Sequence, residues 1–141
     1  MIDIQSLVFD RLYTAIAERY PEANVTTAYV DETAIFPAVV LEQVDNVPLV
    51  YSQTDDNVEN HARITFEVAV YSDKKDEAES ECSDLLQIVD DVMSSMKFRR
   101  TRRDKSRSLT RTIFRQYARY TVIVSQPKEI NGNTVYYMYR R

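Results

Sequence analysis

Residues 63–71 read Arg-Ile-Thr-Phe-Glu-Val-Ala-Val-Tyr, and this stretch decides the fold. Apolar and polar side chains alternate along it, with Ala69 as the neutral exception. Alternation with a period of two predicts a β-strand with one face on the core and the other toward solvent. The predicted core face consists of Ile64, Phe66, Val68 and Val70.

A long amphipathic helix is predicted to follow this strand directly. We expect it to start at Asp73, because acidic residues crowd its first turns, where the positive end of the helix dipole favours them: Asp76, Glu77, Glu79 and Glu81. One face stays apolar for about five turns, through Ala78, Cys82, Leu85, Leu86, Val89, Met93 and Met96. Asp90 and Asp91 fall on the polar side, where we expect them to be solvated.

Further elements are predicted on both sides of this strand and helix. A first helix starts at Asp3, which can cap it, and ends near Tyr20, because Pro21 disfavours helical geometry there. Strands are predicted from the β-branched and aromatic content of four segments, Asn24–Val30, Phe36–Val44, Leu49–Ser52 and Leu109–Ser125. At 141 residues the chain is predicted to be a single domain of the α+β class.

The composition argues against several classes of protein and site. One cysteine rules out an internal disulfide and fits a reducing cytoplasm, and we expect Cys82 to act as a small buried apolar residue. No apolar run approaches the roughly 18 residues of a membrane span, and a signal peptide is not expected. One glycine and one histidine argue against a phosphate-binding loop and a zinc site. We therefore expect a protein built for contacts, with no catalytic residue, metal or cofactor.

Positive charge is concentrated in one short segment. The whole chain carries 18 Lys and Arg against 22 Asp and Glu, a net charge of −4. Removing the seven basic residues of 97–107 and Asp104 from these totals leaves 11 basic and 21 acidic residues, a net charge of −10. Clustering of this kind within an acidic chain indicates that something negative meets the segment. Its basic residues are Lys97, Arg99, Arg100, Arg102, Arg103, Lys105 and Arg107.

Three interpretations of this basic run remain open. It can neutralise nucleic-acid phosphates, dock onto an acidic protein surface such as a neighbouring copy, or form a solvated loop after the helix. The acidity of the remaining chain favours protein docking over dedicated nucleic-acid binding, because an acidic surface repels phosphates. We therefore expect a docking loop.

Two other clusters are candidate contact surfaces. The predicted strand Leu109–Ser125 places Arg111, Arg115, Tyr117 and Arg119 on the face opposite its apolar side chains. Near the C-terminus, Asn131-Gly132 is a strong hairpin signal, with Thr134–Tyr139 as the returning strand. That strand has no polar face, so we expect part of it to cover the core and part to meet another chain.

Several segments, taken in order, carry a resemblance to a known family. Residues 36–42 (Phe-Pro-Ala-Val-Val-Leu-Glu) open a strand, and residues 64–72 run into the acidic helix. Residues 98–100 (Phe-Arg-Arg) then lead to a strand that ends in residues 119–124 (Arg-Tyr-Thr-Val-Ile-Val). From about Ile4 to Val124 the chain resembles the tail terminator, or tail completion, proteins of long-tailed bacteriophages and related neck proteins.

The resemblance implies a non-enzymatic virion protein, assembled in the host cytoplasm. Members of the family cap the tail tube, usually as hexameric rings, stop its polymerisation and present a surface to the head connector. The implied partners are other copies, the tail tube protein and a neck or connector protein, with DNA passing through the channel and no membrane. The implied fold is a mostly antiparallel sheet with two main helices packed on one face.

The candidate interface residues come from the pattern of charged and aromatic residues and not from the family. An acidic loop around Asp55 and Asp56 on one copy, meeting the basic run of the next, would give a head-to-tail contact that closes into a ring. The full set is Arg99, Arg100, Arg102, Arg103, Lys105, Arg107, Arg111, Arg115, Arg119, Asp55, Asp56, Tyr136, Tyr137 and Tyr139. The alternative functions are a neck or head-completion connector and a small nucleic-acid-binding regulator that uses the basic segment.

Overall fold

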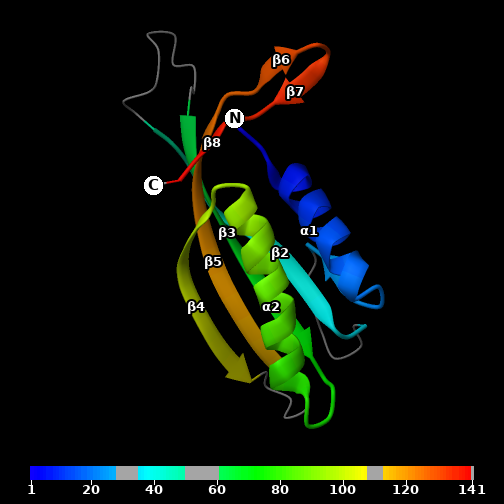
Figure 1. Ribbon diagram of the computed structural model, residues 1–141. Helices are drawn as coiled ribbons and strands as arrows, with labels where there is room; N and C mark the ends of the chain where they lie inside the picture. The colour runs from blue at the N-terminus through cyan, green and yellow to red at the C-terminus, as the bar shows by residue number, and fades with distance from the viewer. Residues whose placement is uncertain (28–34, 50–60, 108–112, 141) are drawn as a thin grey trace.

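The computed structural model describes residues 1–27, 35–49, 61–107 and 113–140. Figure 1 shows two helices against one sheet, with a small hairpin near the C-terminus. The elements are, in chain order, α1 (Gln5–Arg19), β1 (Asn24–Thr26), β2 (Ala38–Pro48), β3 (His61–Ser72), α2 (Ala78–Ser95), β4 (Arg99–Arg107), β5 (Phe114–Ser125), β6 (Lys128–Ile130), β7 (Asn133–Val135) and β8 (Met138–Tyr139).

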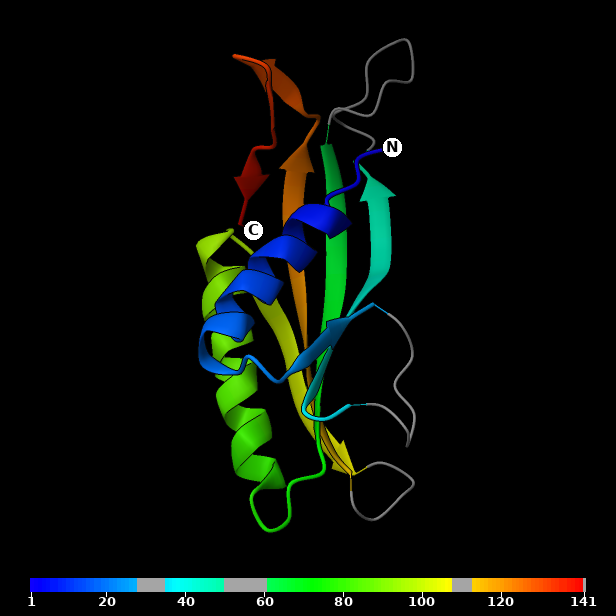
Figure 2. The ribbon, with the colours of Figure 1, turned by 90° about the vertical axis from the view of Figure 1, so that its right-hand side faces the viewer.

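The main sheet has the strand order β1-β2-β3-β5-β4, and β8 pairs with the end of β5. Only the β1–β2 pair is parallel, and every other described pair is antiparallel. Both helices cover the same face of this sheet, and no helix of the described residues lies on the other face (Figure 2). The predicted α+β fold, a mostly antiparallel sheet with two helices on one face, is confirmed.

The core lies between the sheet and the two helices. The alternation predicted for β3 is confirmed, because Ile64, Phe66, Val68 and Val70 are all fully buried toward the helices. The predicted apolar face of α2 is also buried, including Cys82, Met93 and Met96. From α1 the buried residues are Val8, Leu12 and Ile16.

Both helix starts differ from the sequence prediction. The helix expected at Asp73 begins at Ala78, because Asp76 adopts a left-handed backbone conformation with φ of 62°, which no helix can include. The acidic first turn is therefore shorter than predicted and holds Glu79 and Glu81. In α1, Asp3 lies one residue before the N-cap, yet its carboxylate accepts a hydrogen bond from the Gln5 N–H at 3.0 Å.

Strand boundaries also shift. β2 reaches Pro48, four residues beyond the predicted end at Val44, and Leu49 follows it as a buried residue outside any strand. Of the strand predicted at Asn24–Val30, the structure shows β1 at Asn24–Thr26, and residues 28–30 lie outside the described residues. Of the strand predicted at Leu49–Ser52, residues 50–52 also lie outside them.

The C-terminal hairpin is confirmed, but its returning strand is divided. β6 and β7 pair across Asn131-Gly132, and both turn residues have positive φ angles of 53° and 80°. The chain then bends, and β8 joins β5 in the main sheet, with Tyr139 opposite Ile123. In the described part of the chain, no helix is long and apolar enough to cross a membrane.

Candidate interface on the edge strand and the open sheet face

The basic run forms strand β4 at the edge of the sheet, so the prediction that this segment is a loop is wrong. Phe98 fixes the start of this strand, since its side chain is 2% exposed and its ring meets Phe66 edge-on at 5.9 Å. The chain reaches this position through a turn at Lys97, whose φ is 73°. The Lys97 and Arg99 charges therefore do not lie in the last turn of α2, which ends at Ser95 with no basic residue.

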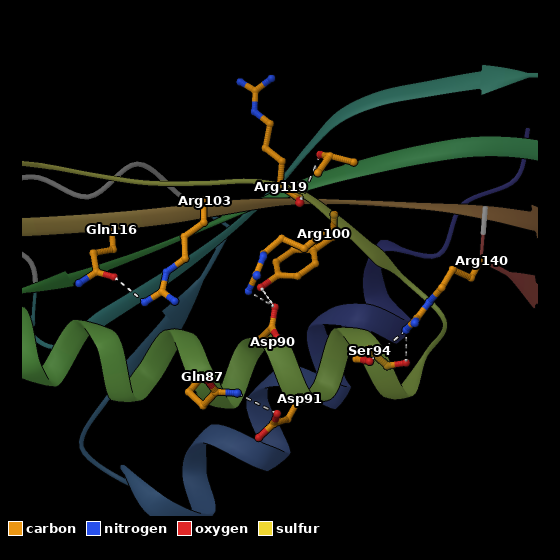
Figure 3. A network of polar contacts seen from close by, with 11 residues as sticks. Gln87, Asp90, Asp91, Ser94, Arg100, Arg103, Gln116, Arg119 and Arg140 are labelled. Atoms are coloured by element: carbon orange, nitrogen blue, oxygen red, sulfur yellow. Dashed lines mark hydrogen bonds and ion pairs between the residues drawn. The ribbon is translucent and has the colours of Figure 1, made fainter.

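One side of β4 faces α2, and three basic residues on this side have partners on α2 or β5. Arg100 pairs with Asp90 at 3.1 Å, and Lys105 pairs with Glu79 at 2.8 Å. Between them Arg103 donates to the Gln116 Oε1 at 3.3 Å (Figure 3). Helix α2 is thus an acidic partner for the basic strand within the same chain. Because these pairs are solvent-exposed, each is expected to contribute only about 0–1 kcal/mol.

Asp90 lies at the centre of this contact, and the prediction that it is solvated is wrong. One of its carboxylate oxygens accepts hydrogen bonds from Arg100 and from the Tyr120 hydroxyl, each at 3.1 Å. Tyr120 is almost completely buried in β5, so burial first, and then the nearby Asp90 charge, raise the pKa of its phenol. The three side chains connect α2, β4 and β5, which fixes the basic strand in place.

The other side of β4 belongs to the helix-free face of the sheet, called here the open face. The prediction that Arg115, Tyr117 and Arg119 share a face away from the core is confirmed. Figure 3 shows the Arg119 side chain directed away from α2. Glu67 of β3 lies between the two arginines, accepting from Arg119 Nε at 3.1 Å and from Arg115 at 3.5 Å.

Aromatic rings add to the contacts on the open face. The Arg115 guanidinium lies 4.6 Å from the Tyr117 ring centre and 5.8 Å from the Tyr71 ring centre, within cation–π range. The Arg102 guanidinium of β4 lies 5.9 Å from the same Tyr117 ring centre. The face is therefore a layer of arginines, carboxylates and tyrosines, and not an apolar surface.

The C-terminal tyrosines have different surroundings. Tyr136 packs against the core, and its hydroxyl donates to the Asp3 carbonyl oxygen at 3.2 Å. Tyr137 and Tyr139 are exposed by 41% and 47%, respectively, which leaves them accessible to another molecule. Arg140 donates to Ser94 at the end of α2.

Four candidate residues can be placed only in part or not at all. Asp55, Asp56 and Arg111 lie outside the described residues. Arg107 is the last residue of β4 and pairs with Phe114 in the register of the sheet.

The sequence did not reveal β4 because its residues carry no apolar alternation. Arg-Arg-Thr-Arg-Arg-Asp-Lys-Ser-Arg has no apolar position, and Lys and Asp are unfavourable in strands. One available signal was that natural edge strands carry charges that discourage uncontrolled pairing. A strand between an acidic helix and solvent can be charged on both sides.

No protein-family model matches this chain, and a search of curated proteins finds no match. In the described ranges, no group of three or more His, Cys, Asp and Glu side chains could hold a metal ion.

The Cys82 thiol is expected to resist alkylation in the folded protein. It is fully buried, and burial, followed by the charge of Glu81, raises its pKa from 9.0 to about 12. Because the thiolate is the reactive form, a maleimide or disulfide reagent at pH 8 should label the chain only after unfolding. The raised pKa also means that this group stabilises the fold below pH 9, and that its contribution is lost as the pH rises toward 12. Rapid labelling of native protein would contradict the packing of α2.

Proposed function

We propose that this chain is a structural subunit of a tailed-phage virion, which assembles into a ring that caps the tail tube and joins the tail to the neck. The proposal starts from the family resemblance of the segments that form β2, β3, β4 and β5. It is supported by one structural observation, the placement of the basic run as an accessible edge strand.

An edge strand offers unpaired backbone N–H and C=O groups to another chain. In β4 these groups are flanked by six basic side chains and one acidic one, while the chain as a whole is acidic. Such an edge favours an acidic protein partner over another basic edge, and the other copies of this chain are acidic. Charge of this kind mainly sets partner choice and association rate.

Electron microscopy of tail tubes tests this function. The tubes should come from the phage or prophage whose genes flank the gene for this chain. We expect the purified chain to bind as a ring at one end of each tube and to stop further elongation. Rings that bind an isolated head connector, and leave tubes to elongate, would instead indicate a neck protein.

A binding measurement with DNA separates the proposal from the nucleic-acid regulator. A virion subunit should show only weak DNA binding that is independent of sequence. A chain that stays monomeric beside tail tubes and binds DNA with nanomolar, strongly salt-dependent affinity would contradict the virion function.

A further inference from the structure

The main sheet has two edges that differ in charge. β4 forms one edge, and no described strand pairs with its outer side. At the other edge β1 pairs with β2 only at Ala38–Val40, so no described strand covers the outer side of β2 from Leu41 to Pro48. This part of β2 carries Glu42 and Asp45 and no basic residue. One free edge is thus acidic and the other is basic.

Strand direction allows these two edges to pair between copies. From β2 through β3 and β5 to β4, each strand is antiparallel to its neighbour. β4 therefore runs opposite to β2. A second copy, rotated about an axis parallel to the strands, keeps its strand directions and presents its β2 antiparallel to β4. The antiparallel strand order can then continue from the sheet of one copy into the sheet of the next.

A row of four charges crosses the open face at one level. Glu42 is opposite Glu67, Glu67 is opposite Arg119, and Arg119 is opposite Arg102. The inner pair, Glu67 and Arg119, forms an ion pair at 3.1 Å. The outer two, Glu42 and Arg102, each lie beside a residue of like charge, which is unfavourable between neighbouring strands.

The outer charges of this row are poorly compensated within one copy. Glu42 has no ion pair among the described residues. Among the described acidic residues, Arg102 forms an ion pair only with Asp104 of its own strand, at 3.6 Å, and both of these side chains are more than half exposed. A partner that brings a positive charge to Glu42 and a negative charge to Arg102 would relieve both repulsions.

A second row of paired residues lies three positions away on each edge strand and again has an acidic residue at the β2 edge and a basic residue at the β4 edge. Asp45 is opposite Thr65, Thr65 is opposite Thr121, and Thr121 is opposite Arg99. The two threonine hydroxyls share a hydrogen bond at 2.9 Å, and the charges again lie only at the edges.

Matching β-bulges create this spacing. Residues three apart on a regular strand point to opposite faces. The register shifts between Gln43 and Asp45 on β2, and between Arg100 and Arg102 on β4. One extra residue in each strand therefore brings both charges of each edge to the open face. The two edges carry opposite charges with the same separation.

We propose that the acidic edge of β2 in one copy pairs with the basic edge of β4 in the next, with Arg102 beside Glu42 and Arg99 beside Asp45. The register is consistent, because three residues forward on β2 correspond to three residues back on β4, as antiparallel pairing requires. The contact is heterologous, so repetition closes a ring if the rotation between copies permits. This inference rests on the proposed function and names the contact between its subunits.

A charge exchange tests the contact. Glu42→Arg and Arg102→Glu, made singly, should each raise the concentration for half-assembly by about tenfold or more, because each places like charges together. The double variant restores the opposite pair and should assemble within about threefold of the unaltered chain. Assembly is measured by sedimentation in solution and by ring formation on tail tubes. Glu18→Arg and Lys75→Glu, at exposed sites away from both edges, are matched controls and should assemble normally.

The outcomes separate this contact from the function itself. Suppose first that the unaltered chain forms rings. If the single variants then assemble equally well, or if the double variant assembles as poorly as the single variants, the edge contact is wrong and the ring function stands. If the unaltered chain never assembles, in solution or on tubes, both are wrong. Protection of Cys82 from alkylation confirms that each variant remains folded.

A disulfide test does not depend on charge. Glu42→Cys combined with Arg102→Cys should give covalent multimers under oxidation, because directly opposite residues have Cβ atoms about 4.5–5.5 Å apart. Each single cysteine variant should remain monomeric on a non-reducing gel. If the unaltered chain forms rings but the double cysteine variant gives no covalent multimers, the register that places Glu42 beside Arg102 is excluded.

Discussion

Replacement of Phe98 by alanine should lower the free energy of unfolding by about 3–5 kcal/mol, the usual cost of removing a buried aromatic ring. Phe98 is 2% exposed and packs against Phe66, so the surrounding core cannot refill the space without moving β3 or α2. Urea unfolding followed by circular dichroism measures the loss. Phe98→Leu keeps much of the apolar volume and serves as the control, with less than half the loss expected.

Phe98→Ala should also affect assembly, because this residue is the apolar anchor at the start of β4. Even under conditions where the variant is mostly folded, the β4 edge should be less ordered, and ring formation should weaken. A loss of less than about 1 kcal/mol would mean that Phe98 does not hold the basic strand to the core.

Replacement of Asp90 by alanine is expected to cost about 1–3 kcal/mol, because it leaves the Tyr120 hydroxyl buried without its acceptor. Arg100 loses its ion pair at the same time, although this pair is partly exposed and adds little. The neighbouring Asp91→Ala is the matched control. Asp91 is exposed, and among the described residues it accepts a hydrogen bond only from Gln87, so its loss should stay within about 0.5 kcal/mol.

A double-mutant cycle isolates the Asp90–Tyr120 bond. Tyr120→Phe removes the hydroxyl that Asp90→Ala leaves unsatisfied, so the double variant should cost less than the sum of the two single variants. Strictly additive losses would show that the hydroxyl and the carboxylate do not interact.

The parts of the fold with one polar and one apolar face could be predicted from sequence. β3 alternates except at Ala69, and α2 keeps one apolar stripe, because each buries one face against the same core. The positions of Arg115 and Arg119 on one face followed from the same period-two argument. The start of α2 was missed because the acidic residues before Ala78 suit a helix dipole equally well in a turn.

The basic strand could not be predicted because its neighbours determine its structure. Nothing within Arg99–Arg107 distinguishes a strand from a loop. Its conformation depends on pairing with β5 and on carboxylates from α2, Asp90 and Glu79, which lie 10 and 26 residues away from their partners in the chain. The equal spacing of charges on β2 and β4 was also hidden, since it arises from bulges that only the sheet register reveals.

The mass of the assembled particle, measured by native mass spectrometry at rising protein concentration and on isolated tail tubes, tests most directly whether this chain is a ring subunit. A heterologous contact between the acidic and basic edges that closes on itself predicts one discrete oligomer above the monomer. A chain that remains a monomer at every concentration and on tubes, or that forms an open series of ever larger filaments, would contradict it.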